Sequence, residues 1–249
     1  MIAYHNDPAL KDRLLAEMAA HREAERLTQG IYWNGAKGCA VGCLLQDPTG
    51  AHLRYETEFG IPAQLAYLED RIFERLPFSE AKKWPERFLA AIPVGADLSL
   101  VWPRFALWLL CDPDHGVRRL IQEPSVIRAI DDVVALCERR IGGEGITKLE
   151  WQQAAINARG AAADAADATA YAAADTARAA VRATADAAAA AAAAADSAAD
   201  ATADAAVAAA DAADDAADAA DDAAARAAYA AQADKLVELL SAADAEVAA

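Results

Sequence analysis

Apolar residues along the first part of the chain recur with the spacing of amphipathic helices. The pattern predicts helices over 8–29, 62–76, 97–110 and 125–141, each bounded by a proline, a glycine or a capping residue. The helix over 97–110 is apolar on most sides, so we expect it to be the central and most buried one. The short apolar stretch 38–45 fits a helix or a strand, and we interpret it as a helix. Because no alternation of period two continues for a useful length, the pattern predicts an all-α fold.

The composition changes sharply after the capping-box sequence Thr147 to Glu150, which starts a further helix. From Ala161 to the end the chain has no Gly and no Pro, and alanine, the best helix former, dominates. Its polar residues follow a 3-4-4 spacing, which places them in one stripe along a straight helix. A single rod would leave the alanine face exposed to water. We therefore predict a helical globular domain over 1–146, followed by an Ala/Asp-rich helical hairpin or bundle over 147–249.

The negative charge belongs mainly to the second predicted domain. The chain holds 39 acidic and 23 basic residues, a net charge of −16. Residues 151–249 hold 17 acidic and 5 basic residues (−12), and residues 1–150 hold 22 and 18 (−4). Such a chain is poorly suited to bind nucleic acid or an anionic membrane directly, since both attract a cationic face. We expect a basic protein surface as the partner, including one that normally holds nucleic acid, and a second copy of the chain as a further candidate.

Several sequence features indicate the cytosol of a host cell. No stretch reaches the roughly 18 apolar residues that a membrane span needs. The first residues lack the basic and apolar runs of a signal peptide. Four cysteines without a dense framework suit a reducing compartment. We therefore predict a cytoplasmic protein.

A row of nine aspartates is the predicted partner-binding site. Over roughly 39 Å of helix it carries about one charge per 4.3 Å, against about 3.4 Å for one DNA strand and about 1.7 Å for a duplex. Two such helices side by side would approach the charge density of a duplex, which is the pattern of a DNA mimic. The alternative is a solvated face that keeps alanine-rich helices soluble. The row consists of Asp196, Asp200, Asp204, Asp211, Asp214, Asp215, Asp218, Asp221 and Asp222.

Two alternatives involve cysteine. Cys39 with Cys43, and Cys111 with His115, are pairs four residues apart that together would supply the ligands of a Cys₃His zinc site. The ordinary interpretation is that they are small buried hydrophobic residues. Cys39 also follows the glycine-containing segment 35–38, so a helix start could lower its pKa and make it a nucleophile beside a histidine. The ordinary interpretation of these glycines is tight turns or close helix packing.

Five segments of the chain are fairly specific: AYHNDP at 3–8, NGAKGCAVGC at 34–43, GIP at 60–62, LEDRIFE at 68–74 and QADKLVELL at 232–240. With these segments the chain resembles a group of uncharacterised phage, prophage and bacterial proteins that have an alanine-rich tail of variable length. The resemblance implies a phage-associated or mobile-element setting, and it implies no activity.

These observations together predict a non-enzymatic, phage-associated acidic interaction protein with no metal and no cofactor. A DNA-mimicking inhibitor of a host defence nuclease or of a CRISPR effector (an anti-CRISPR protein) is the specific form that the aspartate row suggests. The alternatives are a hydrolase or redox protein that depends on Cys39, and a self-assembling structural protein.

Overall fold

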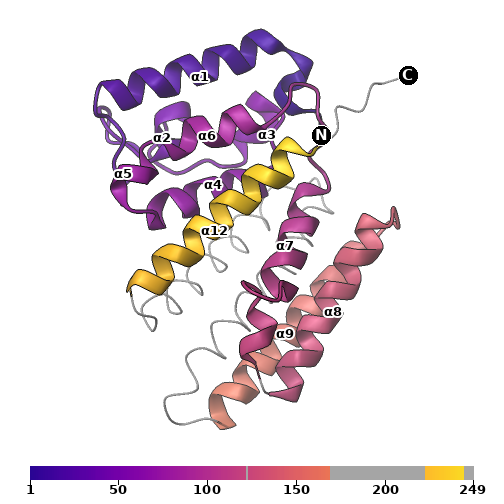
Figure 1. Ribbon diagram of the computed structural model, residues 1–249. Coiled ribbons are helices and arrows are strands. Elements are labelled where there is room, and N and C mark those ends of the chain that lie inside the picture. The colour runs from indigo at the N-terminus through magenta and orange to yellow at the C-terminus, as the bar shows by residue number, and fades with distance from the viewer. Residues whose placement is uncertain (122, 169–221, 244–249) are drawn as a thin grey trace. The chain divides into compact units, whose positions relative to one another are not determined.

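The computed structural model describes residues 1–121, 123–168 and 222–243, and within these ranges the chain is helical (Figure 1). The described residues form no strand, only isolated bridges such as the one between Leu27 and Gly38. The predicted all-α class is therefore confirmed. The chain divides into two compact units, Met1–Val101 with Tyr229–Ala249, and Trp102–Ala228.

The first unit is built mainly from short helices. α1 packs against α2 and α6, and α4 packs against α2, α3 and α6. The core between them contains large fully buried side chains such as Trp84, Phe73 and Phe88. The elements are η1 (Ala3–Asn6), α1 (Pro8–Glu23), α2 (Ala40–Leu45), α3 (Arg54–Phe59), α4 (Ala63–Arg75), α5 (Phe78–Ala81), α6 (Trp84–Ala91) and the end of α12 (Asp222–Ser241).

α1 begins where the sequence predicts and ends earlier. The Asp7 carboxylate accepts a hydrogen bond from the backbone N–H of Ala9 at 2.9 Å, as a helix cap does. The helix ends at Glu23, and Glu25 has a positive φ of 53°. The predicted continuation to residue 29 is wrong because the loop after α1, and not the helix, buries Leu27.

α2 confirms the helical interpretation of 38–45, and all six of its residues are buried. It is therefore more enclosed than α7 (Val101–Cys111), which exposes Arg104 and Cys111. The prediction that the helix over 97–110 is the most buried one is wrong, since one side of it faces solvent. The reason lies in packing, because α2 is covered by its neighbours in the first unit.

The end of α12 belongs to the first unit. Tyr229, Leu236 and Leu240 on this helix are buried. Asp234 forms an ion pair with Arg87 of α6 at 2.6 Å. The apolar side chains of the segment at 235–240 therefore attach the last helix to the fold.

The second unit contains α7, η2 (Val117–Leu120), α8 (Pro124–Ile141) and α9 (Lys148–Ala168). α8 and α9 lie side by side (Figure 1). α8 ends at Ile141 before Gly142, as predicted. The predicted capping box is also confirmed, because a Glu150 carboxylate oxygen accepts a hydrogen bond from the Thr147 backbone N–H at 2.8 Å. The core of this unit includes Leu110, Ile130, Val133, Trp151 and Ala158.

α8 and α9 pack together on either side of residue 146, and the end of α12 belongs to the first unit. The predicted globular domain over 1–146 stays a prediction. A separate module over 147–249 stays a prediction, since much of that range lies outside the described residues. In the described ranges no helix combines the length and the apolar character needed to cross a membrane.

Candidate functional site

A buried polar cluster forms in the first unit between α2, α4 and the loop 46–53. Cys39 is the capping residue before α2. Asp70 and Glu74 lie one helical turn apart on α4, so their side chains share a face. His52 comes from the loop. We call these four residues the Cys39 cluster.

The ligand-type atoms of the cluster lie close together. One sulfur or carboxylate oxygen atom from each of Cys39, Asp70 and Glu74 lies within 4.8 Å of the other two. Cys39 is 1% exposed and Asp70 8% exposed, and Glu74 is half-buried. His52 is 2% exposed, and its Nε2 lies 3.1 Å from the Asp70 Oδ2. A thiol and two carboxyl groups with a neighbouring imidazole can hold a metal ion.

Each of the three ligand-type side chains is oriented by a donor outside the set. An ionised Asp70 can only accept, so in that state the His52 Nε2 carries the hydrogen and donates to Oδ2. The Gly30 backbone N–H donates to Oε2 of Glu74 at 2.7 Å. The Gly42 backbone N–H donates to the Cys39 Sγ at 3.4 Å. Oδ1 of Asp70 is buried and has no hydrogen-bond partner in the described part of the chain, so the cluster retains an unsatisfied acceptor.

Burial and mutual repulsion disfavour negative charge in the cluster. Burial raises the pKa of the Cys39 thiol well above its usual range, and the charge of Asp70 and the hydrogen bond of the thiol to the Asp70 carboxylate raise it further. Burial also raises the pKa of Glu74 to about 7, although the Gly30 N–H opposes the shift. Without a cation in the cluster, Cys39 is therefore a thiol at neutral pH.

Aromatic rings enclose His52. Its ring stacks on Tyr67 with 3.9 Å between the centroids and 19° between the planes. Tyr32 meets it edge-on at 5.7 Å. The Tyr32 ring also fills the space beside Gly50, where an added Cβ would lie 2.4 Å from Tyr32 Cζ. Gly50 has a positive φ of 66°, so glycine is required there for both space and backbone conformation.

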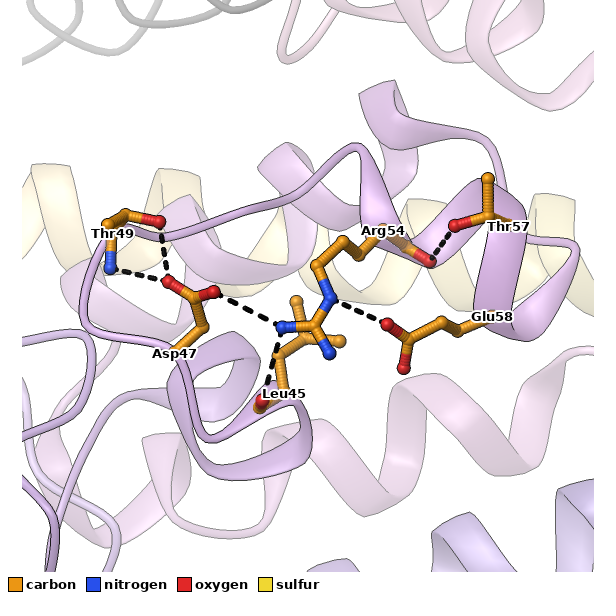
Figure 2. Close-up of polar contacts among 6 residues, drawn as sticks. All are labelled: Leu45, Asp47, Thr49, Arg54, Thr57 and Glu58. Carbon is orange, nitrogen blue, oxygen red and sulfur yellow. Dashed lines mark hydrogen bonds and ion pairs between the residues drawn. The ribbon is translucent and has the colours of Figure 1, made fainter.

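Polar contacts fix the loop that carries His52 (Figure 2). The Arg54 guanidinium donates to the Leu45 carbonyl oxygen at 3.3 Å and to the Asp47 carboxylate at 3.2 Å. Asp47 also accepts a hydrogen bond from the Thr49 N–H at 2.7 Å. Arg54 therefore ties the end of α2 to the start of α3, on either side of His52.

Close packing requires two of the three glycines in the NGAKGCAVGC segment, Gly38 and Gly42. A Cβ on Gly42 would lie 1.6 Å from the Tyr32 carbonyl oxygen, and one on Gly38 would lie 1.8 Å from the same atom. The Cys39 N–H donates to the Ile31 carbonyl oxygen at 2.8 Å. Within the segment 35–38, close packing therefore accounts for Gly38, whereas Gly35, with a φ of 93° and open space beside it, marks a turn.

A second buried acid lies next to the Cys39 cluster on α4. Glu69 is fully buried, and its Oε2 accepts a hydrogen bond from the Tyr55 hydroxyl at 2.8 Å. Burial raises the pKa of Glu69 to about 8, and the charge of Asp70 adds to the shift. Oε1 of Glu69 has no hydrogen-bond partner among the described residues. The interior of the first unit thus contains two neighbouring acids with unsatisfied oxygens.

The predicted aspartate row lies almost entirely outside the described residues. Asp222 is the first residue of α12, but its side chain is outside the described part of the chain. The row as a binding surface therefore stays a prediction. Its other members, which lie outside the described ranges, are Asp196, Asp200, Asp204, Asp211, Asp214, Asp215, Asp218 and Asp221.

The four residues weighed for zinc are divided between the two units. Cys43 donates its thiol hydrogen toward the Gly38 carbonyl oxygen at 3.5 Å and packs in the core of the first unit. Cys111 and His115 belong to the second unit. The cysteine that the structure places among other potential ligands is Cys39, and sequence spacing missed its partners Asp70 and Glu74.

The expected lowering of the Cys39 pKa is wrong. Cys39 does occupy a helix start, but burial and the neighbouring carboxylate raise its pKa. A thiolate nucleophile at neutral pH requires a lowered pKa, and the raised pKa of Cys39 therefore argues against this role. Of the four histidines, His52 is the one that contacts the cluster, and it bonds to Asp70.

Comparison with known proteins adds no relative, because no family model, no curated protein and no solved structure matches this chain.

Proposed function

We propose that this chain is a phage-associated acidic interaction protein that binds a basic protein surface through its aspartate-rich segment. The observation that carries the proposal is the separation of charge, with −12 of the net −16 in residues 151–249. A basic surface is attracted to such a segment over about one Debye length, roughly 8 Å at physiological salt. The charge spacing along the row suggests a surface that normally holds DNA, as in a nuclease or a CRISPR effector.

Both flanks of the aspartate-rich segment are attached to folded helices. On one side α9 packs against α8, and Trp151 is 3% exposed. On the other side α12 buries Leu236 and Leu240 in the first unit. A partner bound to the row is therefore connected to folded parts of the protein at both ends.

The proposal is tested by charge reversal. We expect substitution of Asp211, Asp214, Asp215 and Asp218 by Lys to abolish binding to a basic partner while the helical content stays unchanged. The matched control reverses the same number of exposed acids elsewhere, at Asp12, Glu80, Asp114 and Asp132. Both variants change the net charge by +8, so total charge is equal and only its position differs.

The measurement is inhibition of duplex DNA cleavage by a purified nuclease and by a guide-loaded CRISPR effector. A DNA mimic competes with the duplex, so added DNA restores cleavage and added salt weakens binding. If the control variant loses inhibition as fully as the row variant, the row is not the binding surface. Binding that does not respond to salt contradicts the electrostatic argument.

A further inference from the structure

We propose that the first unit binds one thiophilic divalent cation of the zinc class, with Cys39, Asp70 and Glu74 as its protein ligands and His52 as the residue that positions Asp70. This site is independent of the aspartate row. It rests on geometry in the described residues, and its partners are side chains from two helices and one loop.

The separations among the three ligands are close to those of a coordination shell. Zinc–sulfur bonds of about 2.3 Å and zinc–oxygen bonds of about 2.1 Å in a tetrahedron place ligand atoms about 3.4–3.6 Å apart. The three atoms already lie within 4.8 Å of one another. Shifts of about 1 Å, within the reach of side-chain rotation, complete the shell.

His52 and the Gly30 N–H each bond to one oxygen of a ligand carboxylate, so the other oxygen of that carboxylate is available to a metal ion. The imidazole of His52 occupies one oxygen of Asp70, and the Gly30 N–H occupies one oxygen of Glu74. The remaining oxygen of Asp70 is itself buried and has no nitrogen donor among the described residues, although the side chain as a whole is 12% exposed and the Cys39 thiol lies beside it. A ligand carboxylate held by an outer donor, with its second oxygen unpaired, is the arrangement that metal sites use. This unpaired oxygen distinguishes the site from a simple group of acids.

The donor set selects the class of metal. One sulfur and two carboxylate oxygens favour zinc and similar borderline ions over Mg²⁺ and Ca²⁺, which prefer oxygen ligands alone. Three protein ligands leave a fourth position open to water or another small ligand. The half-buried Glu74 provides the exposed side of the site.

A divalent cation would also offset the negative charge that the three ligands bring together. When the metal binds, the Cys39 S–H bond breaks, a sulfur–metal bond forms, and the proton passes to solvent. The same ion relieves the repulsion among Asp70, Glu74 and the new thiolate. The metal complex carries a net charge of −1 from three anionic ligands and one divalent cation. Binding therefore releases protons, which is expected when a protonated thiol becomes a ligand.

The experiment uses the full chain, purified with a chelator and then freed of it, and titrates it with Co²⁺ as a spectroscopic substitute for Zn²⁺. We expect one equivalent to produce a thiolate-to-cobalt charge-transfer band that Zn²⁺ removes. Calorimetry in two buffers of different ionisation enthalpy should show proton release. Because the band requires sulfur, ions held by surface aspartates do not contribute to it.

Variants then identify the ligands. Cys39→Ser should abolish the band, and Asp70→Asn and Glu74→Gln should each weaken binding more than 100-fold. His52→Gln should weaken it about 10- to 100-fold, as losses of outer-shell donors do. The matched controls are Cys43→Ser, four residues further along the chain in α2, and Cys111→Ser, an exposed thiol. Both should bind as the unaltered chain does.

A band that persists in Cys39→Ser, or no band with the unaltered chain, overturns the proposal. If Cys39→Ser loses its helical content, Zn²⁺ protection of Cys39 against alkylation in the unaltered chain decides. Alkylation at an equal rate with and without Zn²⁺ then rejects the site. Reversal of the aspartate row should leave the band unchanged, so failure of either proposal can be recognised separately.

Discussion

The buried carboxyl group of Glu69 should make the stability of the first unit depend on pH, and this dependence can be measured directly. Its carboxyl group is fully buried, and burial raises its pKa from 4.5 to about 8. The folded protein therefore keeps a proton that the unfolded chain releases at lower pH. The associated stability is fully present below pH 4.5 and is lost as pH rises through 8. Glu69→Gln removes this dependence, because the amide is neutral at every pH and still offers an oxygen to Tyr55.

The size of the change in the free energy of unfolding follows from the difference between the folded and unfolded pKa values of Glu69. One pKa unit corresponds to about 1.4 kcal/mol. Between pH 5 and pH 7, the titration of Glu69 alone should lower the free energy of unfolding of the unaltered chain by about 2–3 kcal/mol. The free energy of unfolding of Glu69→Gln, relative to the unaltered chain, should therefore increase by about 2–3 kcal/mol over the same range. This is a large part of the usual stability of a domain.

The assay is urea unfolding of the full chain at several pH values, in the presence of a chelator. Trp84 reports on the same region, because it is 1% exposed and its indole N–H donates to the Glu69 carbonyl oxygen at 2.9 Å. Glu80→Gln, at an exposed position, is the control and should show no pH-dependent difference. A Glu69→Gln difference that stays constant between pH 5 and pH 7 refutes the reasoning.

Three further predictions concern local structure. Thr147→Ala should destabilise the second unit by about 1 kcal/mol, since it removes a helix cap; thermal unfolding measures this, and an unchanged midpoint contradicts it. Gly42→Ala should destabilise the first unit by about 1–3 kcal/mol through collision with Tyr32. The control Gly160→Ala, in open space on α9, should instead slightly stabilise the second unit. Hydrogen bonds from Thr147 and Arg139 lower the pKa of Glu150 to about 2. The stability that these bonds provide is present above pH 4.5 and is lost as pH falls toward 2. Hydrogen exchange should therefore show the backbone amides of Glu150→Gln less protected than those of the unaltered chain at pH 6. Near pH 2 the protection of the two chains should be equal.

The helices could be predicted from the sequence because their signals are local. Asp7 before Pro8, Gly142 after Ile141 and the Thr147 capping box mark boundaries within a few residues. The end of α1 was missed because Leu27 continues the apolar spacing although a loop buries it. Periodicity reports which side chains are buried, and it does not distinguish a helix from a loop that packs on the same core.

The Cys39 cluster could not be predicted in the same way, because it depends on contact between α2 and α4. Spacing placed Cys39 with Cys43, whose side chain instead packs in the core. A usable signal was present in α4. Asp70 shares a helix face with Ala66 and Phe73, which are both fully buried, so a carboxylate there falls on an apolar surface. A charged residue in that position indicates either a paired charge or a binding site.

The acids of α4 show two ways in which a protein interior accommodates negative charge. Glu69 is neutralised by a proton, because Tyr55 is its polar neighbour and no cationic side chain contributes to its pKa. Asp70 and Glu74 lie beside the thiol of Cys39, the capping residue of α2, and Oδ1 of Asp70 has no hydrogen-bond partner among the described residues. The proposed cation would be shared by all three ligands at once. The pH dependence of Glu69 should therefore survive in the chelator-treated protein, while the thiolate–metal signal should require Asp70 and be independent of Glu69→Gln.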